Sequence, residues 1–278
     1  HTLFPYTTLF RSGFEENNLR IYCSSETHSS VDKAVKIAGI GHENLIKIEV
    51  DQAFRLKPDQ LEKAIVKDIN NGNIPICVIA TIGTTSSTAV DPVKDIAGIC
   101  RKHNCWLHVD AAYAGSAMVL HDYRWMMEGI EYADSFVFNP HKWMFTNFDC
   151  SAFFVKDKDL LVKSFQLIPE YLKSDLDKQV NNFSDWGVQL GRRFRALKLW
   201  FVLRSFGAEN IRNTIRRHIE WGAMFESFVN KDPDFELLAP RTLNLVCFRY
   251  VRHSYSEKQL DELNTGLLKK INASGEMY

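Results

Sequence analysis

The chain has 278 residues, of which 45% are hydrophobic, and its 34 basic residues balance its 34 acidic residues. A neutral chain lacks the basic excess that displaces counterions from a polyanion, so its composition argues against a nucleic-acid partner. No apolar run approaches the roughly 20 residues that a membrane-spanning helix needs. The six cysteines are scattered and form no C-x-x-C pair, which favours free thiols in a reducing compartment and no metal site.

Residues 1–12 fit no pattern in the sequence that follows, and we expect them to be a leader that is foreign to the protein. They lack the basic start and the long apolar centre of a signal peptide. The expected protein therefore begins near Gly13. Since the chain also stops soon after a helical segment, we expect an internal fragment of a longer protein.

Strand and helix signals alternate along the first part of the chain. Apolar runs predict strands at 19–24, 45–50, 74–82, 106–109, 135–138 and 151–155. Helical spacing predicts helices at 29–38 and 58–70, and the pair Asp91-Pro92 predicts a third that ends near His103, with Asp91 as its N-cap. Strand–helix–strand units of this length predict an α/β fold, in which helices cover both faces of a mostly parallel sheet.

The pattern changes after about residue 160. Residues 169–182 are polar and carry little periodicity, which predicts a long loop. Helices are predicted at 190–206 and 211–229, strands at 235–238 and 243–250, and a last helix at 257–272. We therefore predict a large domain over 13–205, with a mobile loop at 167–183, followed by part of a smaller α/β domain over 206–278.

Two motifs lie at the ends of predicted strands. Asp110 belongs to the segment LHVDAAYAG (107–115), and Lys142, 32 positions later, belongs to NPHKW (139–143). Ligands of such sheets bind beyond the carboxyl ends of the strands, so both side chains are expected at one edge. An acid for a pyridine nitrogen and an amine for an aldehyde are the minimum that pyridoxal 5'-phosphate (PLP) requires.

Both side chains also have an ordinary interpretation, since most lysines lie at the surface and an aspartate after a strand often belongs to a turn. A carboxylate at a buried strand end costs several kcal/mol unless a cation pairs with it, which favours a functional Asp110. Ala111 and Ala112 leave space there for a flat ring. Lys142 is expected in an apolar, desolvated seat that keeps its amine partly neutral.

Further polar residues accompany this pair. His28, just before a predicted helix, is placed to stack on one face of a ring. Thr84 and Thr85 follow another strand, and their hydroxyls either reach the cofactor or bond to their own turn. Asn139 and His141 flank the lysine and are candidate donors to the ring oxygen or the phosphate of the cofactor.

These segments, together with NFDCSA (147–152) and LGRRFR (190–195), resemble the group II PLP-dependent decarboxylases, most closely the aromatic-L-amino-acid decarboxylases. The resemblance runs from about residue 13 to residue 250. It implies the fold type I of PLP-dependent transferases (aspartate aminotransferase-like) and a cytoplasmic homodimer. It also implies decarboxylation of an aromatic L-amino acid to its aryl-ethylamine and carbon dioxide.

The resemblance further implies a role for each matching residue. Lys142 would bind PLP as a Schiff base, Asp110 would pair with the pyridine nitrogen, and His28 would stack on the ring. Tyr171, in the predicted loop, would help to protonate the carbanion that remains after carbon dioxide departs. Cofactor contacts are implied for Thr85, Asn139 and Ala112, with His141 near the phosphate.

Several alternatives stay open. Relatives that make an aldehyde by oxidative deamination tend to replace the loop tyrosine or the stacking histidine, so Tyr171 and His28 favour simple decarboxylation. The alternatives are an aromatic aldehyde synthase, a group II decarboxylase of histidine, glutamate or diaminobutyrate, and an inactive, truncated dimer partner. The family's N-terminal part, with its phosphate-binding loop, has no counterpart in the chain, so we expect weak cofactor binding and an inactive fragment.

Overall fold

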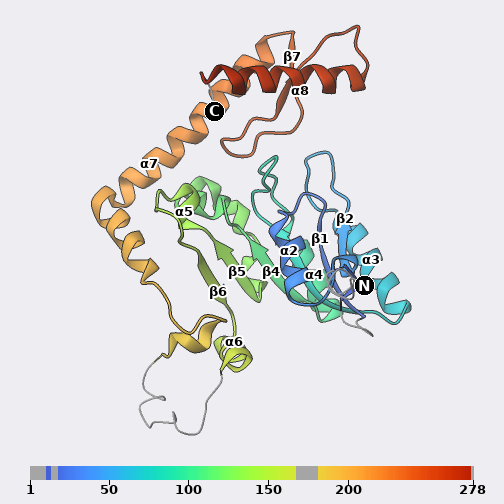
Figure 1. The fold of residues 1–278 in the computed structure, drawn as a ribbon, viewed down its shortest axis with the longest axis vertical. Coiled ribbons are helices and arrows are strands. Elements are labelled where there is room, and N and C mark those ends of the chain that lie inside the picture. The colour runs from blue at the N-terminus through green and yellow to red at the C-terminus, as the bar shows by residue number, and fades with distance from the viewer. Residues whose placement is uncertain (1–10, 14–17, 167–180, 277–278) are drawn as a thin grey trace, which may run out of the picture.

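The computed structural model describes residues 11–13, 18–166 and 181–276 (Figure 1). A six-stranded sheet in the order β2-β1-β3-β4-β5-β6 forms the centre of its first part. In chain order the strands are β1 (Leu19–Ser24), β2 (Leu45–Ile48), β3 (Ile74–Thr81), β4 (Trp106–Asp110), β5 (Ser135–Phe138) and β6 (Ala152–Val155). The first five are parallel, which confirms the predicted mostly parallel sheet. β6 runs antiparallel to β5, since their connection holds only the short α5 (Pro140–Trp143) and no covering helix.

Helices cover both faces of this sheet. Tyr22 and Val78 belong to one apolar cluster, which includes α3 (Pro58–Asn70) and α4 (Val93–His103). Their neighbours Ile21 and Ile79 belong to a second cluster with α2 (Ser30–Ile37). Because successive side chains of a strand point to opposite faces, the two clusters lie on opposite sides of the sheet. The connections hold the 3-10 turns η1 (His42–Asn44), η2 (Ala114–Val119), η3 (His121–Met127) and η4 (Ile130–Tyr132), and α6 (Lys158–Phe165) follows β6.

Asp91 does not cap α4, so the prediction of an N-cap there is wrong. The N-cap position is Pro92, and no side-chain hydrogen bond closes this end of the helix. The buried carboxylate of Asp91 instead accepts hydrogen bonds from the backbone N–H groups of Leu56 and Thr81, each at 2.8 Å. The Asp91 carboxylate therefore binds backbone groups of two segments that are distant in sequence and does not bind the N-terminus of the helix that follows it.

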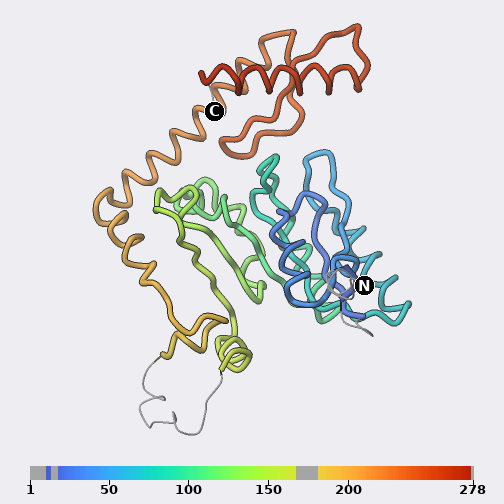
Figure 2. The backbone as a smooth tube through the Cα atoms, viewed as in Figure 1, coloured from blue at the N-terminus to red at the C-terminus, as the bar shows by residue number. Residues whose placement is uncertain are grey.

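The second part of the chain is reached through one long helix, α7 (Arg195–Lys231) (Figure 2). Gly207 has a non-helical backbone (φ 73°, ψ 155°) and separates the two halves that were predicted as separate helices. The hairpin of β7 (Phe235–Leu237) and β8 (Phe248–Tyr250) and the helix α8 (Glu257–Ser274) follow. Of the predicted mobile loop, residues 167–180 lie outside the described residues; η7 (Phe183–Trp186) comes after them.

Several hydrogen bonds among the described residues join the parts, one of them from Cys247 Sγ to the backbone oxygen of Ser86 at 2.8 Å. The Tyr113 hydroxyl donates to Asn244 Oδ1 at 2.9 Å, and Trp143 Nε1 donates to Nδ1 of His218 on α7 at 3.0 Å. Trp143 also stacks on Tyr113, with ring centroids 4.7 Å apart. Among the described helices, none has the length and apolar character needed to cross a bilayer.

Candidate active site

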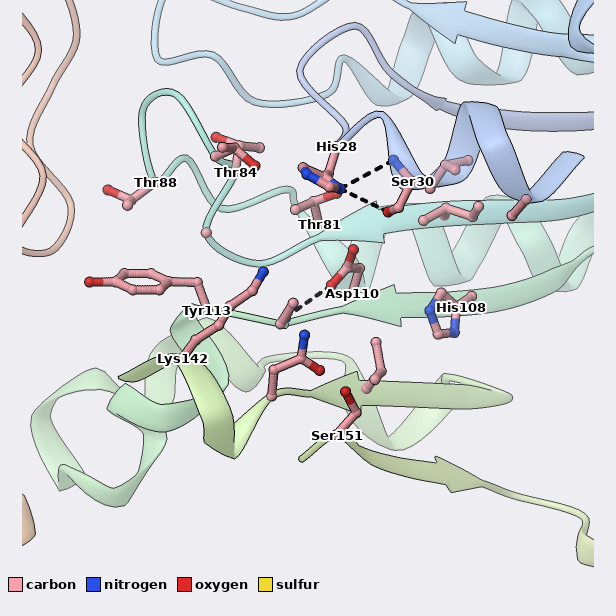
Figure 3. A pocket seen from close by; sticks show the side chains of 18 of the residues that line it. His28, Ser30, Thr81, Thr84, Thr88, His108, Asp110, Tyr113, Lys142 and Ser151 are labelled. Atoms are coloured by element: carbon pink, nitrogen blue, oxygen red, sulfur yellow. Dashed lines mark hydrogen bonds between the residues drawn. The ribbon is translucent and has the colours of Figure 1, made fainter. Parts of the chain in front are cut away.

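A cavity of about 1010 Å³ opens at the carboxyl ends of the central strands (Figure 3). Polar residues line the cavity at the ends of β3, β4 and β5. Apolar residues of α2 and of the sheet line the rest of it. The structure thus brings the residues expected from four separate segments to one place, at the edge that the topology predicted. The residues expected from the sequence that line it are His28, Thr84, Thr85, Asp110, Ala112, Asn139 and Lys142.

Asp110 is the last residue of β4, directly opposite Thr81 of β3. Its Oδ1 atom accepts a hydrogen bond from the backbone N–H of Ala112 at 2.9 Å, which fixes the carboxylate at the strand end. Within the described part of the chain, no basic side chain forms an ion pair with it under a 4.0 Å limit. The negative charge therefore remains available to a cationic group of a ligand.

Lys142 comes from the four-residue helix α5, which begins directly after β5 with Pro140 at its first position. Figure 3 shows its amine reaching into the space beside the Asp110 carboxylate. The expected desolvated seat is wrong for the chain as described, because Lys142 is exposed. The apolar neighbours Trp143 and Met144 are buried, but they turn away into the core.

His28 and the two threonines occupy the opposite wall of the cavity. The backbone N–H of Ser30 donates to His28 Nδ1 at 3.2 Å, so this nitrogen carries no proton in that arrangement. Thr84 is buried, and its hydroxyl oxygen accepts the N–H of Ala89 at 3.0 Å. The turn therefore uses Thr84, whereas Thr85 stands exposed at the cavity wall.

One expected residue, His141, is not brought into the cavity. His141 is absent from its lining; its Nδ1 accepts the backbone N–H of Cys150 at 2.9 Å, and its ring meets Phe148 edge-on at 4.8 Å. The expected position of His141 beside the phosphate is therefore not supported by its side-chain contacts. Tyr171 lies outside the described residues.

The sequence argument missed Thr81, Tyr113 and His108, which all line the cavity. Thr81 could have been found, because it ends an apolar run in the strand beside that of Asp110. Burial raises the pKa of the Tyr113 hydroxyl and lowers that of the His108 imidazole. His108 could not be singled out from the sequence, because its partner, Ser135, lies on the neighbouring strand β5.

The residues present fit PLP. Thr81 Oγ1 and Asn139 Oδ1 are buried and have no hydrogen-bond partner among the described residues. A buried polar atom without a partner costs about 1–3 kcal/mol, so such atoms at a cavity indicate a polar ligand. An unpaired carboxylate, an accessible amine and these two oxygens match a ligand with a basic ring nitrogen, an aldehyde and a hydroxyl group.

Comparison with known proteins agrees with this chemistry. The family model described as the pyridoxal-dependent decarboxylase conserved domain matches residues 12–251. A tyrosine decarboxylase of Papaver somniferum is 44% identical over 276 residues, covering 94% of this chain and 54% of the relative. A phenylacetaldehyde synthase of Arabidopsis thaliana is 45% identical over 264 residues, covering 94% and 54%. The chain thus spans about half the length of the curated relatives it matches.

A solved structure gives the same result. The crystal structure of Oryza sativa TDC with PLP and tryptamine has a TM-score of 0.91 and 38% sequence identity, covering 94% of this chain and 55% of that one. The expected fold type I of PLP-dependent transferases is thereby confirmed. The residues that the family model matches, 12–251, include the sheet, the residues that line the cavity and α7. This chain belongs to the pyridoxal-dependent decarboxylase family.

Proposed function

We propose that the protein decarboxylates an aromatic L-amino acid to its aryl-ethylamine and carbon dioxide with PLP as cofactor. The observation that carries the proposal is the pairing of an unneutralised carboxylate, Asp110, with an accessible amine, Lys142, in one cavity. A tyrosine decarboxylase and a PLP-bound structure with tryptamine among the similar proteins support an aromatic substrate. Decarboxylases of histidine, glutamate or diaminobutyrate share the scaffold but have no specific observation in their favour.

Each residue has a proposed task. PLP, when bound, supplies an electron-poor ring that takes up the electron pair of the broken bond between the α-carbon and the carboxylate. Asp110 would hold the proton on the pyridine nitrogen through its negative charge. Lys142 would hold the cofactor through its amine.

The remaining residues are proposed to orient the cofactor and to protonate the α-carbon of the substrate. We assign to His28 a face-to-face contact with the ring, and to Ala112 the opposite face, since both line the cavity. Thr85 and Asn139 would bind polar groups of the cofactor, and the unpartnered Asn139 Oδ1 supports this assignment. Tyr171 would deliver a proton to the α-carbon once carbon dioxide has left. A cytoplasmic homodimer and the domain division at 205/206 also remain proposals, which rest on the family resemblance and on the sequence pattern.

An aromatic aldehyde synthase is a second candidate, because the phenylacetaldehyde synthase is as similar to this chain as the tyrosine decarboxylase is. The presence of Tyr171 and His28 supports decarboxylation. The two reactions differ in their products: a decarboxylase releases the amine, whereas the synthase releases an aldehyde with ammonia and hydrogen peroxide. Incubation with tyrosine, tryptophan, phenylalanine and their possible competitors glutamate and histidine, followed by detection of these products, separates the candidates.

Borohydride trapping tests the site itself. The purified chain is incubated with PLP and reduced, and the modified peptide is located by mass spectrometry. We expect the label on Lys142, and Lys142→Arg should abolish it while leaving the circular dichroism spectrum unchanged. Lys156, a lysine outside the cavity, provides a matched control through Lys156→Arg, which should label as the wild type does. A label on other lysines alone would refute the assignment of Lys142. A folded chain without label would show that this chain does not bind PLP, and the proposed activity would then not belong to it.

A further inference from the structure

A second group of polar side chains lies next to Asp110 on the same face of the sheet. His108 precedes Asp110 by two residues on β4, so strand alternation places both on one face, and both line the cavity (Figure 3). Ser135 of β5 pairs in register with His108. The Ser135 Oγ atom lies 2.8 Å from His108 Nδ1 and 2.8 Å from Trp106 Nε1.

The chemistry of these groups determines where the proton of His108 resides. An indole N–H can only donate, so the Ser135 oxygen accepts a hydrogen bond from Trp106. Within the described residues, the other side-chain partner of the buried Ser135 hydroxyl is His108 Nδ1, and we assign the hydroxyl proton to that hydrogen bond. A nitrogen that accepts carries no proton, and the neutral ring therefore keeps its proton on Nε2.

Two further effects act on the charge of His108. Burial lowers the pKa of its imidazole, and the Asp110 carboxylate raises it; burial is the larger effect. β6 places the ring of Phe153 beside His108, with the two ring centroids 6.2 Å apart. Besides Asp110, the titratable groups among the described residues that face His108 or share its cavity are Cys77 of β3, His28 before α2, Tyr113 after β4, and Lys142 of α5.

We propose that Trp106 and Ser135 hold His108 in its neutral form, so that the full negative charge of Asp110 is left for the pyridine nitrogen of the cofactor. His108 is thus a positioning residue, and the inference rests on the proposed function. A protonated imidazole two residues away along the strand competes with the ring nitrogen for the same carboxylate. At that separation, an added positive charge is expected to weaken PLP binding on the order of tenfold.

The test compares how PLP affinity of the 278-residue chain depends on pH. In Ser135→Ala, the Nδ1 atom of His108 loses its donor and is free to take up a proton. We expect its dissociation constant for PLP, measured by absorbance titration, to rise on the order of tenfold over that of the wild type at about pH 6 and to match it at about pH 8. Ser151→Ala is the matched control, because Ser151 lines the same cavity without contacting His108.

Further variants keep the test decisive if Ser135→Ala folds poorly. Trp106→Phe removes the N–H that orients the Ser135 hydroxyl, so its proton is no longer directed at His108 Nδ1, and the same loss at low pH is expected. Adding His108→Gln to either variant replaces the titratable ring by an uncharged amide and should restore the affinity near pH 6 (about the pH at which histidine titrates). A residue with a merely structural role would not produce loss and restoration that depend on pH.

A spectroscopic readout locates the effect at the cofactor. With PLP labelled by ¹⁵N at the pyridine nitrogen, the wild type should retain a pyridinium signal at low pH, and Ser135→Ala should move it toward that of neutral pyridine. Identical pH profiles in wild type, Ser135→Ala and Trp106→Phe would overturn the proposal. If borohydride also labels Lys142, that result refutes only the role of His108. Absence of the Lys142 label would refute the cofactor site and this inference together.

Discussion

The hydrogen bond between Trp143 and His218 should couple the segment that carries Lys142 to helix α7. Trp143 is only 4% exposed, and its Nε1 donates to His218 Nδ1 at 3.0 Å. Substituting His218 by phenylalanine keeps a ring stacked near the indole but removes the acceptor. A buried N–H without an acceptor costs about 1–3 kcal/mol, so we expect His218→Phe to lower the free energy of unfolding by that amount.

A double-mutant cycle measures the coupling directly. Trp143→Phe removes the donor, so His218→Phe should cost about 1 kcal/mol less in that background than in the wild type. Urea unfolding followed by circular dichroism is suitable, because it does not depend on tryptophan fluorescence. Trp221→Phe is the control: Trp221 also stacks on His218 but is 53% exposed, and a change within about 0.5 kcal/mol is expected. Strictly additive effects of the two core substitutions would refute the reasoning.

Three other substitutions test backbone and charge. Gly98→Ala, at an exposed position of α4 with nothing within 4 Å of the added Cβ, should raise the free energy of unfolding by about 0.5–1 kcal/mol in urea titrations. Gly83→Ala should lower the free energy of unfolding by about 2–4 kcal/mol, since φ is +84° and the new Cβ lies 2.5 Å from that of Ala114. Gly72→Ala, with φ +80° and nothing within 4 Å, should cost only about 1–2 kcal/mol. Equal costs for the two variants would contradict a steric clash between the new Cβ of residue 83 and Ala114. Burial raises the pKa of Asp91 from 3.8 to about 6, so the folded chain binds this proton more tightly than the unfolded chain does. The stabilisation from this proton is present below about pH 4 and is lost as the pH rises toward about 6. The difference in the free energy of unfolding between wild type and Asp91→Asn should therefore shift by up to about 3 kcal/mol across that range. A constant difference would contradict the raised pKa.

Local sequence signals were sufficient for much of the large sheet. The bounds of β1, β5 and α3 coincide with the apolar runs and the helical spacing that predicted them. Asp110 and Lys142 could be assigned to one edge because each follows a strand, and parallel strands bring their carboxyl ends together. The family resemblance added the identity of the cofactor, which position alone does not specify.

Helix geometry explains why the neighbours of Lys142 do not surround its amine. Successive residues of a helix are rotated by about 100° around its axis, so neighbours in NPHKW cannot all face the cavity. When Lys142 faces it, Trp143 turns into the core, where it stacks on Tyr113, and His141 turns toward Cys150. Apolar neighbours in sequence are therefore no measure of how desolvated a side chain is on so short a helix.

Other features depend on which strands are neighbours. Ser135 lies opposite His108 only because β4 and β5 are adjacent with that register. The Asp91 carboxylate accepts hydrogen bonds from two backbone N–H groups of separate segments and does not cap its helix. This arrangement requires the loop before α3 to pass close to β3. Hydrophobic periodicity identifies the strands but not their order, and a polar atom's partner across the sheet follows from that order.

The polar atoms that lack partners concentrate where the cofactor is proposed to bind. Thr81 Oγ1, Asn139 Oδ1 and the charge of Asp110 each make the ligand-free fold less favourable than a satisfied or apolar end of the cavity would. Ser116 Oγ, outside the cavity, is also buried without a partner among the described residues, whereas the chain itself satisfies the buried hydroxyls of Thr84 and Ser135. A ligand that satisfies these groups binds the folded chain and not the unfolded one, so it stabilises the fold in proportion to its concentration. Cofactor binding and folding stability are therefore linked through the same few atoms, which explains why the local rules fail at this edge of the sheet and hold over its core.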